Sequence, residues 1–157
     1  MLITKYSIGL DELPDARAIR NRVFIEEQRF IEEFDDTDAI ANHVVLYDGD
    51  PLLTLFTAQI GAPAGIPVAT GRTFPKEGKD TVWIIGRVAV TPEYRMHGVG
   101  KTLMEELESV AKSNGATTIE IGAQLHAVGF YGKIGYVAYG DDFMEEHVPH
   151  IKMRKFL

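Results

Sequence analysis

Residues 88–108, VAVTPEYRMHGVGKTLMEELE, pass from an extended segment through a turn into a helix, and this stretch decides the fold. The turn contains Gly98 and Gly100, followed by Lys101 and Thr102. Glycines two positions apart let the backbone approach a ligand with no Cβ in the way. The first amides of a helix have no intrahelical partner and carry the positive end of the helix dipole. The stretch therefore predicts a phosphate site.

Two nucleotide-binding motifs do not fit the turn. The Walker A motif of NTPases needs a glycine five positions before its Gly-Lys pair, and that position is Arg95. The dinucleotide fingerprint needs a third glycine where this chain has Leu103. What is left is R-x-x-G-x-G, in which Arg95, His97 and Lys101 are side-chain donors around a pyrophosphate. The alternative is a strand-to-helix turn that uses its glycines for geometry alone.

Hydrophobic periodicity predicts the other elements outward from this turn. An apolar stripe makes 98–113 the clearest helix, and Gly115 is placed to end it. Residues 32–42 are predicted to be a loop or short helix, 52–60 are ambiguous, and the acids of 141–147 are predicted to lie in an exposed turn. Strands are predicted over 1–8, 43–47, 67–74, 81–90, 117–125, 135–139 and 147–157, and further helices over 11–30 and 126–134.

The 157 residues, 45% apolar and 25% charged, have the composition of one globular domain, and we expect a single domain over 1–157. No run approaches the about 20 apolar residues of a membrane span, and the N-terminus lacks the apolar region of a signal peptide. The absence of cysteine excludes disulfides, thiolate metal sites and a cysteine nucleophile. We expect a cytoplasmic protein with no membrane partner.

The net charge of −7 is unevenly distributed. Twelve of the 23 acidic residues but five of the 16 basic ones lie in the first fifty residues. No basic stripe is present, so we expect no nucleic-acid partner. The acidic excess would suit a cationic substrate, although a solvated acidic face explains it equally well.

The pattern around the turn extends along most of the chain. Residues 86–108 and 119–143, together with RNRVFIEEQ at 20–28, HVVLYDGD at 43–50 and EEHVPHIKM at 145–153, resemble the GNAT-type N-acetyltransferase superfamily, in particular its ElaA/YjcF-like branch. The resemblance implies an α/β (α+β) fold: a mixed, mostly antiparallel sheet of six or seven strands, helices on both faces and a splayed central strand pair. It also implies acetyl-CoA as co-substrate and a small-molecule amine as acceptor, with no metal, and a homodimer by analogy.

The resemblance also implies which residues bind acetyl-CoA. Its pantetheine arm would lie along one strand, its pyrophosphate would lie on the glycine turn, and an amide near Val90 would polarise the thioester. Two departures are the segment 51–65, which is longer than this branch needs, and Met96, where a small residue is common. The implied cofactor residues are Val88, Ala89, Val90, Arg95, Met96, His97, Gly98, Val99, Gly100, Lys101, Thr102 and Phe130.

Catalytic and acceptor residues follow from the same resemblance. Tyr131 is at the position of a tyrosine near the thioester sulfur, where a phenol would protonate the thiolate; its alternative role is core packing. Glu27, ranked above the acceptor-site residue Glu26, is the candidate base, although adjacent glutamates are commonly solvated. His43 and His150 are acceptor-site candidates that could instead make local hydrogen bonds.

Two rival functions stay open at this point. One is a catalytically silent, regulatory module that binds CoA on the same fold. The other is a histidine-carboxylate metal site, for which only His147 and His150 have suitable spacing and no paired motif is present. Arg72 and Arg87, in predicted strands, are expected to be structural ion-pair partners.

Overall fold

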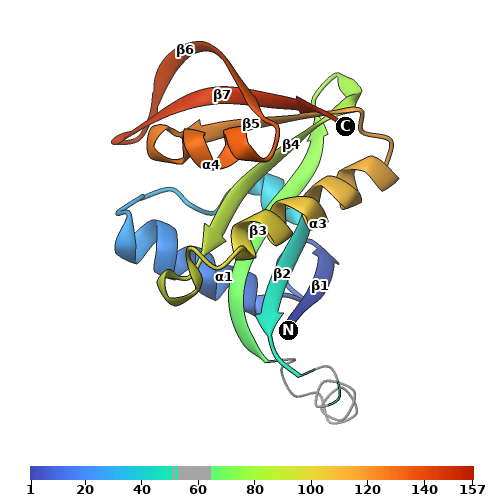
Figure 1. The fold of residues 1–157 in the computed structure, drawn as a ribbon, viewed down its shortest axis with the longest axis vertical. Coiled ribbons are helices and arrows are strands. Elements are labelled where there is room, and N and C mark those ends of the chain that lie inside the picture. Colours follow the sequence, from blue (N-terminus) through green and yellow to red (C-terminus); the bar gives the residue numbers. More distant parts are fainter. Residues whose placement is uncertain (51, 53–64) are drawn as a thin grey trace.

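The computed structural model describes residues 1–50, 52 and 65–157, which form one seven-stranded sheet flanked by helices (Figure 1). The strands are ordered β1-β2-β3-β4-β5-β7-β6. Their bounds are Leu2–Ile8 (β1), Asn42–Asp48 (β2), Ile66–Lys76 (β3), Lys79–Val90 (β4), Thr118–Gln124 (β5), Val137–Glu145 (β6) and Val148–Phe156 (β7). The helices are Pro14–Arg20 (α1), Val99–Ser113 (α3) and Val128–Lys133 (α4), with a π-helical continuation Asn21–Glu27 (η1) and 3-10 turns Asp36–Ala39 (η2), Pro92–Tyr94 (η3) and Leu125–Ala127 (η4).

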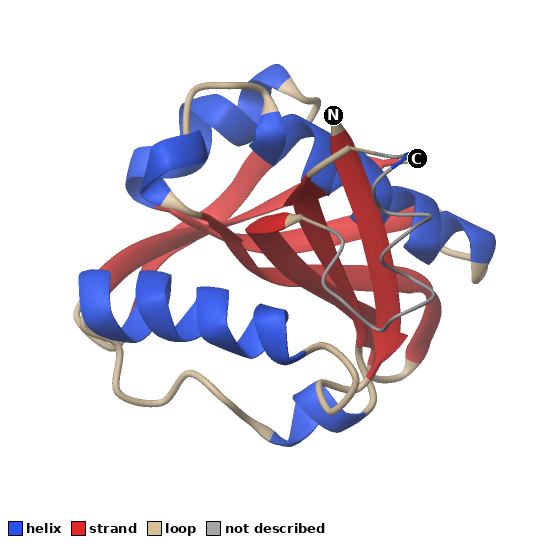
Figure 2. Cartoon of the chain, turned by 90° about the horizontal axis from the view of Figure 1, so that it is seen from below, coloured by secondary structure: helices blue, strands red, loops and turns tan. Residues whose placement is uncertain are grey.

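The sheet is mostly antiparallel, as the resemblance implies. Among the described strands, only β4 and β5 run parallel, and they are joined by the crossover through α3. Helices lie on both faces of the sheet (Figure 2). The mixed, mostly antiparallel fold with helices on both faces is thereby confirmed.

Two hydrophobic clusters fix the helices to opposite faces. Leu103 and Leu107 of α3 pack with Val44, Val68 and other strand residues in one cluster. The second cluster gathers α1 side chains against the other face and includes Ala89. Because alternate residues of a strand face opposite sides, β4 contributes side chains to both clusters.

The predicted elements agree with the structure except near the end of the chain. The long N-terminal helix is α1 followed by η1, and the helix predicted over 98–113 is α3, with Gly115 in the left-handed region (φ 97°) after it. The exposed turn predicted over 141–147 is wrong: β6 continues to Glu145, so only Glu146 and His147 connect it to β7. Most of β6 is solvent-exposed on both faces, so it has no apolar alternation to reveal a strand. The long segment 51–65 lies almost wholly outside the described residues.

Candidate active site

The two parallel strands separate at the centre of the sheet. They pair only at Val82–Thr118, Trp83–Ile119 and Ile84–Glu120. Beyond Ile84, β4 continues to Val90 along β3, and within the described residues no strand covers its other edge. A bulge at Arg87, whose φ is 52°, bends β4 in this region. The result is a V between β4 and β5, with the predicted pantetheine residues Val88, Ala89 and Val90 on one arm.

The N-terminus of α3 lies beside the β4 arm. Gly98 precedes the helix in the left-handed conformation, with φ 78°. Thr102 N makes the first helical bond, to Gly98 O at 3.2 Å, so the amides of Val99, Gly100 and Lys101 come before the hydrogen-bond ladder begins. This end of a fifteen-residue helix is an anion site in its backbone geometry.

The loop before α3 also has an unusual backbone at Met96. This side chain is 99% exposed, and its φ is 67°, a conformation that favours glycine. The loop therefore turns sharply just before His97 and Gly98. Met96 and His97 stay predictions as cofactor residues.

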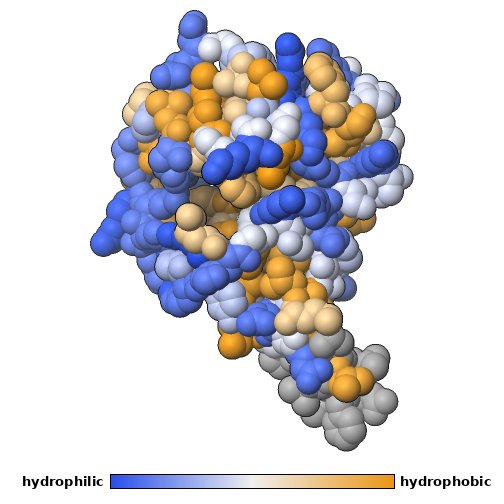
Figure 3. All heavy atoms as spheres, in the orientation of Figure 1, coloured by the Kyte–Doolittle hydropathy of each residue, from blue (hydrophilic) through white to orange (hydrophobic). Residues whose placement is uncertain are grey.

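The Phe130 side chain, on α4, contacts the start of α3. A Cβ built on Gly100 would lie 3.1 Å from Phe130 Cζ, so the aromatic ring rests almost on the glycine backbone. Phe130 is 38% exposed. Figure 3 shows this face of the molecule hollowed between α4 and the loop that precedes α3. The structure thus brings Phe130 to the same end of the V as the glycine turn.

Arg95 is held from two sides. Its Nε donates to Val90 O at 3.0 Å, and Nη1 and Nη2 each donate to one oxygen of Glu27 at 2.7 Å. The hydrogen bond from Arg95 lowers the pKa of Glu27, against the opposing effect of burial. The predicted base is therefore the counter-ion of the predicted pyrophosphate ligand, a contact across 68 residues of sequence.

Gln28, the residue after Glu27, reaches the other arm of the V, which is formed by β5. Gln124 Nε2, at the end of β5, donates to Gln28 Oε1 at 2.8 Å. His126 Nε2 lies 2.6 Å from Gln124 Oε1. Together these two neighbours span the opening of the V, because Glu27 contacts Arg95 and Gln28 contacts Gln124. Sequence reasoning assigned no role to either glutamine, because their contact joins residues 96 positions apart.

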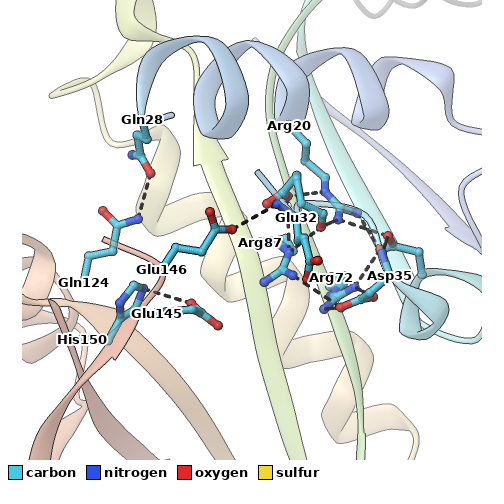
Figure 4. Close-up of polar contacts among 12 residues, drawn as sticks. Arg20, Gln28, Glu32, Asp35, Arg72, Arg87, Gln124, Glu145, Glu146 and His150 are labelled. Atoms are coloured by element: carbon cyan, nitrogen blue, oxygen red, sulfur yellow. Dashed lines mark hydrogen bonds and ion pairs between the residues drawn. The ribbon is translucent and has the colours of Figure 1, made fainter. Parts of the chain in front are cut away.

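The β6–β7 turn docks on the same segment (Figure 4). The Glu146 carboxylate accepts hydrogen bonds from Ile31 N at 2.8 Å and Glu32 N at 3.0 Å. His147 Nε2 lies 2.7 Å from Gln28 O. These backbone hydrogen bonds lower the pKa of Glu146. The β6–β7 hairpin is thereby held against the segment that follows η1.

Tyr131 lies on α4, half-buried beside other aromatic rings. Its ring centre is 5.0 Å from that of Phe130 and 5.9 Å from that of Tyr136. Burial raises the pKa of Tyr131 to about 12. Within residues 1–50, 52 and 65–157 its hydroxyl has no hydrogen-bond partner. The packing role is thus observed, while the catalytic role stays a prediction.

The acceptor-site candidates lie in different environments. His43 on β2 is 1% exposed, its Nε2 lies 2.9 Å from Asp38 O, and burial lowers its pKa. His150 on β7 is 3% exposed, with Nδ1 2.8 Å from Val148 O and Nε2 3.2 Å from Glu145. Glu26 is exposed and accepts from Asn21. Both histidines therefore make the local hydrogen bonds that their alternative role predicts.

A network of buried charges lies beneath the V (Figure 4). Arg20 Nε donates to Glu33 at 2.8 Å, and its Nη1 donates to Asp38 at 2.6 Å. Burial alone would raise the pKa of Asp38, but hydrogen bonds from Arg20 and Asp35 N outweigh it and lower the pKa to about 2. The structural role expected for two strand arginines is confirmed, since the network comprises Arg20, Arg72, Arg87, Glu33, Asp35 and Asp38.

Two further observations concern metal ions and membranes. Across the described ranges, no three or more His, Cys, Asp or Glu side chains are placed to hold a metal ion. In the same part of the chain, every helix is too short or too polar to cross a bilayer.

Comparison with known proteins agrees with this geometry. The model of the acetyltransferase (GNAT) domain matches residues 20–157. YjcF of Bacillus subtilis, described as an uncharacterized N-acetyltransferase, is 32% identical over 148 residues, covering 92% of this chain and 93% of its own. An N-acetyltransferase structure from Lactobacillus plantarum superposes with a TM-score of 0.79 and 30% identity, covering 99% of this chain and 98% of its own. Escherichia coli ElaA superposes with a TM-score of 0.78 and 22% identity, covering 99% of each chain.

Proposed function

Because the chain belongs to the GNAT acetyltransferase family, we propose that it transfers an acetyl group from acetyl-CoA to a primary amine of a small molecule. The observation that carries the proposal is the V between β4 and β5 with the open N-terminus of α3 at its side. An extended amide-containing arm fits along the unpaired edge of β4, and a diphosphate fits the amides at the start of α3. A cytoplasmic location and a homodimer belong to the same proposal by analogy only.

The residues of this chain would hold the co-substrate mostly through main chain. Val88, Ala89 and Val90 offer backbone groups to the pantetheine amides, and the turn through Gly98 and Gly100 offers N–H groups to the diphosphate. Acetyl-CoA supplies the activated acetyl group when bound. Phe130, which packs on Gly100, restricts the same end of the V.

Tyr131 would stabilise charge on the departing sulfur. A phenol with a pKa of about 12 stays protonated at neutral pH and can donate a hydrogen bond. It is a weaker acid than a thiol, whose pKa is about 8.5. Its contribution is therefore a hydrogen bond to the developing thiolate rather than complete proton transfer.

The amine must lose a proton to attack, and Glu27 is the candidate group. Its lowered pKa makes it a weak base while it is paired with Arg95. A carboxylate in this position can still attract an ammonium group and pass its proton to water. Glu26, on the same turn of η1, is the neighbouring alternative.

Titration with CoA, followed by a thiol-release screen over primary amines, tests the proposal. We expect CoA to bind and at least one small amine to give acetyl-CoA-dependent thiol release. CoA binding without turnover of any amine would favour the regulatory module over the enzyme. Failure to bind CoA at saturating concentration would overturn both.

A further inference from the structure

The Arg95–Glu27 pair occupies the position at which the proposed function places an anion. Both terminal nitrogens of the Arg95 guanidinium donate to Glu27 at 2.7 Å, one to each oxygen. This is the fork-to-fork arrangement that arginine also makes with phosphate. Nε remains bonded to Val90 O at 3.0 Å, so the side chain stays anchored to β4 while its outer edge holds a carboxylate.

This ion pair is exposed enough to exchange its partner. The Arg95 and Glu27 side chains are 38% and 40% exposed. Ion pairs of this exposure are weak, because water and salt screen them. A diphosphate carries more charge and would also bind the free amides at the start of α3. The balance therefore favours replacement of Glu27 at Arg95 when the diphosphate arrives.

The surroundings indicate that Glu27 would compete with the diphosphate. A carboxylate and a diphosphate that share one guanidinium repel each other. A second ion pair, Arg22–Glu93, joins η1 to η3 next to the first one. Gln28, directly after η1, is bonded to Gln124 and not to Arg95, so this contact does not depend on the partner of Arg95.

We propose that Glu27 occupies the diphosphate-binding edge of Arg95 in the free protein and that CoA displaces it, releasing the Glu27 carboxylate toward the acceptor side of the V. This inference rests on the proposed function. Glu27 then links the two substrates. CoA binds first, and only the complex presents a free carboxylate to an ammonium group. By linkage, an ammonium compound that uses this carboxylate binds the CoA complex more tightly than the free protein.

Calorimetric titration with CoA tests the inference. Glu27→Gln removes the competing anion, so we expect its Kd for CoA to fall about fivefold relative to wild type. Glu93→Gln removes the same charge from the neighbouring pair and is the matched control. We expect its Kd to stay within about twofold of wild type, because Glu93 is paired with Arg22 and acts on Arg95 only as a more distant charge. Thermal melts check that each variant is folded.

Two further measurements separate the exchange from a general charge effect. In an Arg95→Gln background, Glu27→Gln should give no gain in CoA affinity, because the guanidinium edge that Glu27 occupies is no longer present. Carbon-13 NMR should show the Glu27 carboxyl titrating at a higher pH in the CoA complex than in the free protein, since Arg95 no longer pairs with it.

The outcomes distinguish the inference from the proposed function. Unchanged or weaker CoA binding by Glu27→Gln, a gain equal to that of Glu93→Gln, or a gain that persists without Arg95 would overturn the exchange while CoA binding by wild type stands. Absence of CoA binding by wild type would overturn the proposed function itself.

Discussion

Tyr131 lies on α4 with its ring against Phe130 and Tyr136, and its hydroxyl is the one polar atom that packing does not require. Tyr131→Phe keeps these ring contacts. We expect kcat to fall about a hundredfold, the size of a lost hydrogen-bond donor to developing charge, with the Kd for CoA unchanged. Steady-state thiol release and CoA titration measure the two quantities. Because burial raises the pKa to about 12, Tyr131 stays protonated and its contribution persists through alkaline pH.

The control for Tyr131 is Tyr139 on β6, whose ring lies 4.7 Å from the Arg154 guanidinium. Tyr139→Phe makes the same chemical change away from the V and should retain full activity. Equal activities of the two variants would show that Tyr131 serves packing alone.

Asp38 is the residue whose loss should most affect folding. It is 6% exposed and accepts from both Arg20 and Arg72. Asp38→Asn removes a negative partner from the buried guanidinium groups of Arg20 and Arg72. We therefore expect the free energy of unfolding, measured by urea titration, to fall by about 3–5 kcal/mol. Asp36→Asn, on the exposed side of η2, should change it little. A similar loss in both variants would contradict the network's importance.

The lowered pKa of the Asp38 carboxyl predicts that the folded protein loses stability in acid. Its folded pKa of about 2 is below the value of about 3.9 expected in the unfolded chain. The contribution of Asp38 is therefore complete above that unfolded value and disappears as the pH falls toward 2. Asp38→Asn should flatten the pH dependence of unfolding in this window.

Contact between α3 and β3 depends on a glycine. A Cβ on Gly71 would lie 2.6 Å from Leu107 Cδ1, whereas one on Gly86 in β4 would have nothing within 4 Å. Gly71→Ala should cost about 1–3 kcal/mol of unfolding free energy through overpacking. Gly86→Ala is the matched control and should cost less.

Leu107 supplies a second check on that contact. In a Leu107→Val background the alanine at position 71 has more room, so the cost of Gly71→Ala should shrink. An equal cost in both backgrounds, measured by urea unfolding, would mean that backbone preference and not the helix contact sets the penalty.

Elements and local motifs could be predicted from the sequence, and long-range contacts could not. The stripe on α3 and the R-x-x-G-x-G turn are readable because their residues are close in sequence and a buried face imposes a period. β6 lacks such a face, so its length was underestimated. The Arg95–Glu27 and Gln28–Gln124 contacts join residues 68 and 96 positions apart. The packing of the α1–η1 segment against the sheet brings these residues together.

Across the whole molecule, the sheet is weakest at its centre. Its two parts share three residue pairs between β4 and β5 and a backbone hydrogen bond from Thr117 N to Thr81 O. In the open part of the V, side chains make further links between the described segments. Gln28 reaches Gln124, and Glu146 reaches the backbone of Ile31 and Glu32. Such a seam can hold a ligand between its arms without breaking either hydrophobic cluster.

Glu146→Ala tests whether the β6–β7 hairpin holds this seam. The carboxylate is the acceptor for two amides that are 115 and 114 residues away in sequence. Without it, we expect the amides of Ile31 and Glu32 to exchange hydrogen severalfold faster, while those of α3 keep their protection. Asp141→Ala removes an exposed acid from the same hairpin and should leave exchange unchanged. Hydrogen exchange followed by NMR measures both variants. If Ile31 and Glu32 keep wild-type protection in Glu146→Ala, the segment is held by other contacts, such as those of Arg20 with Glu33, and the hairpin does not stabilise it.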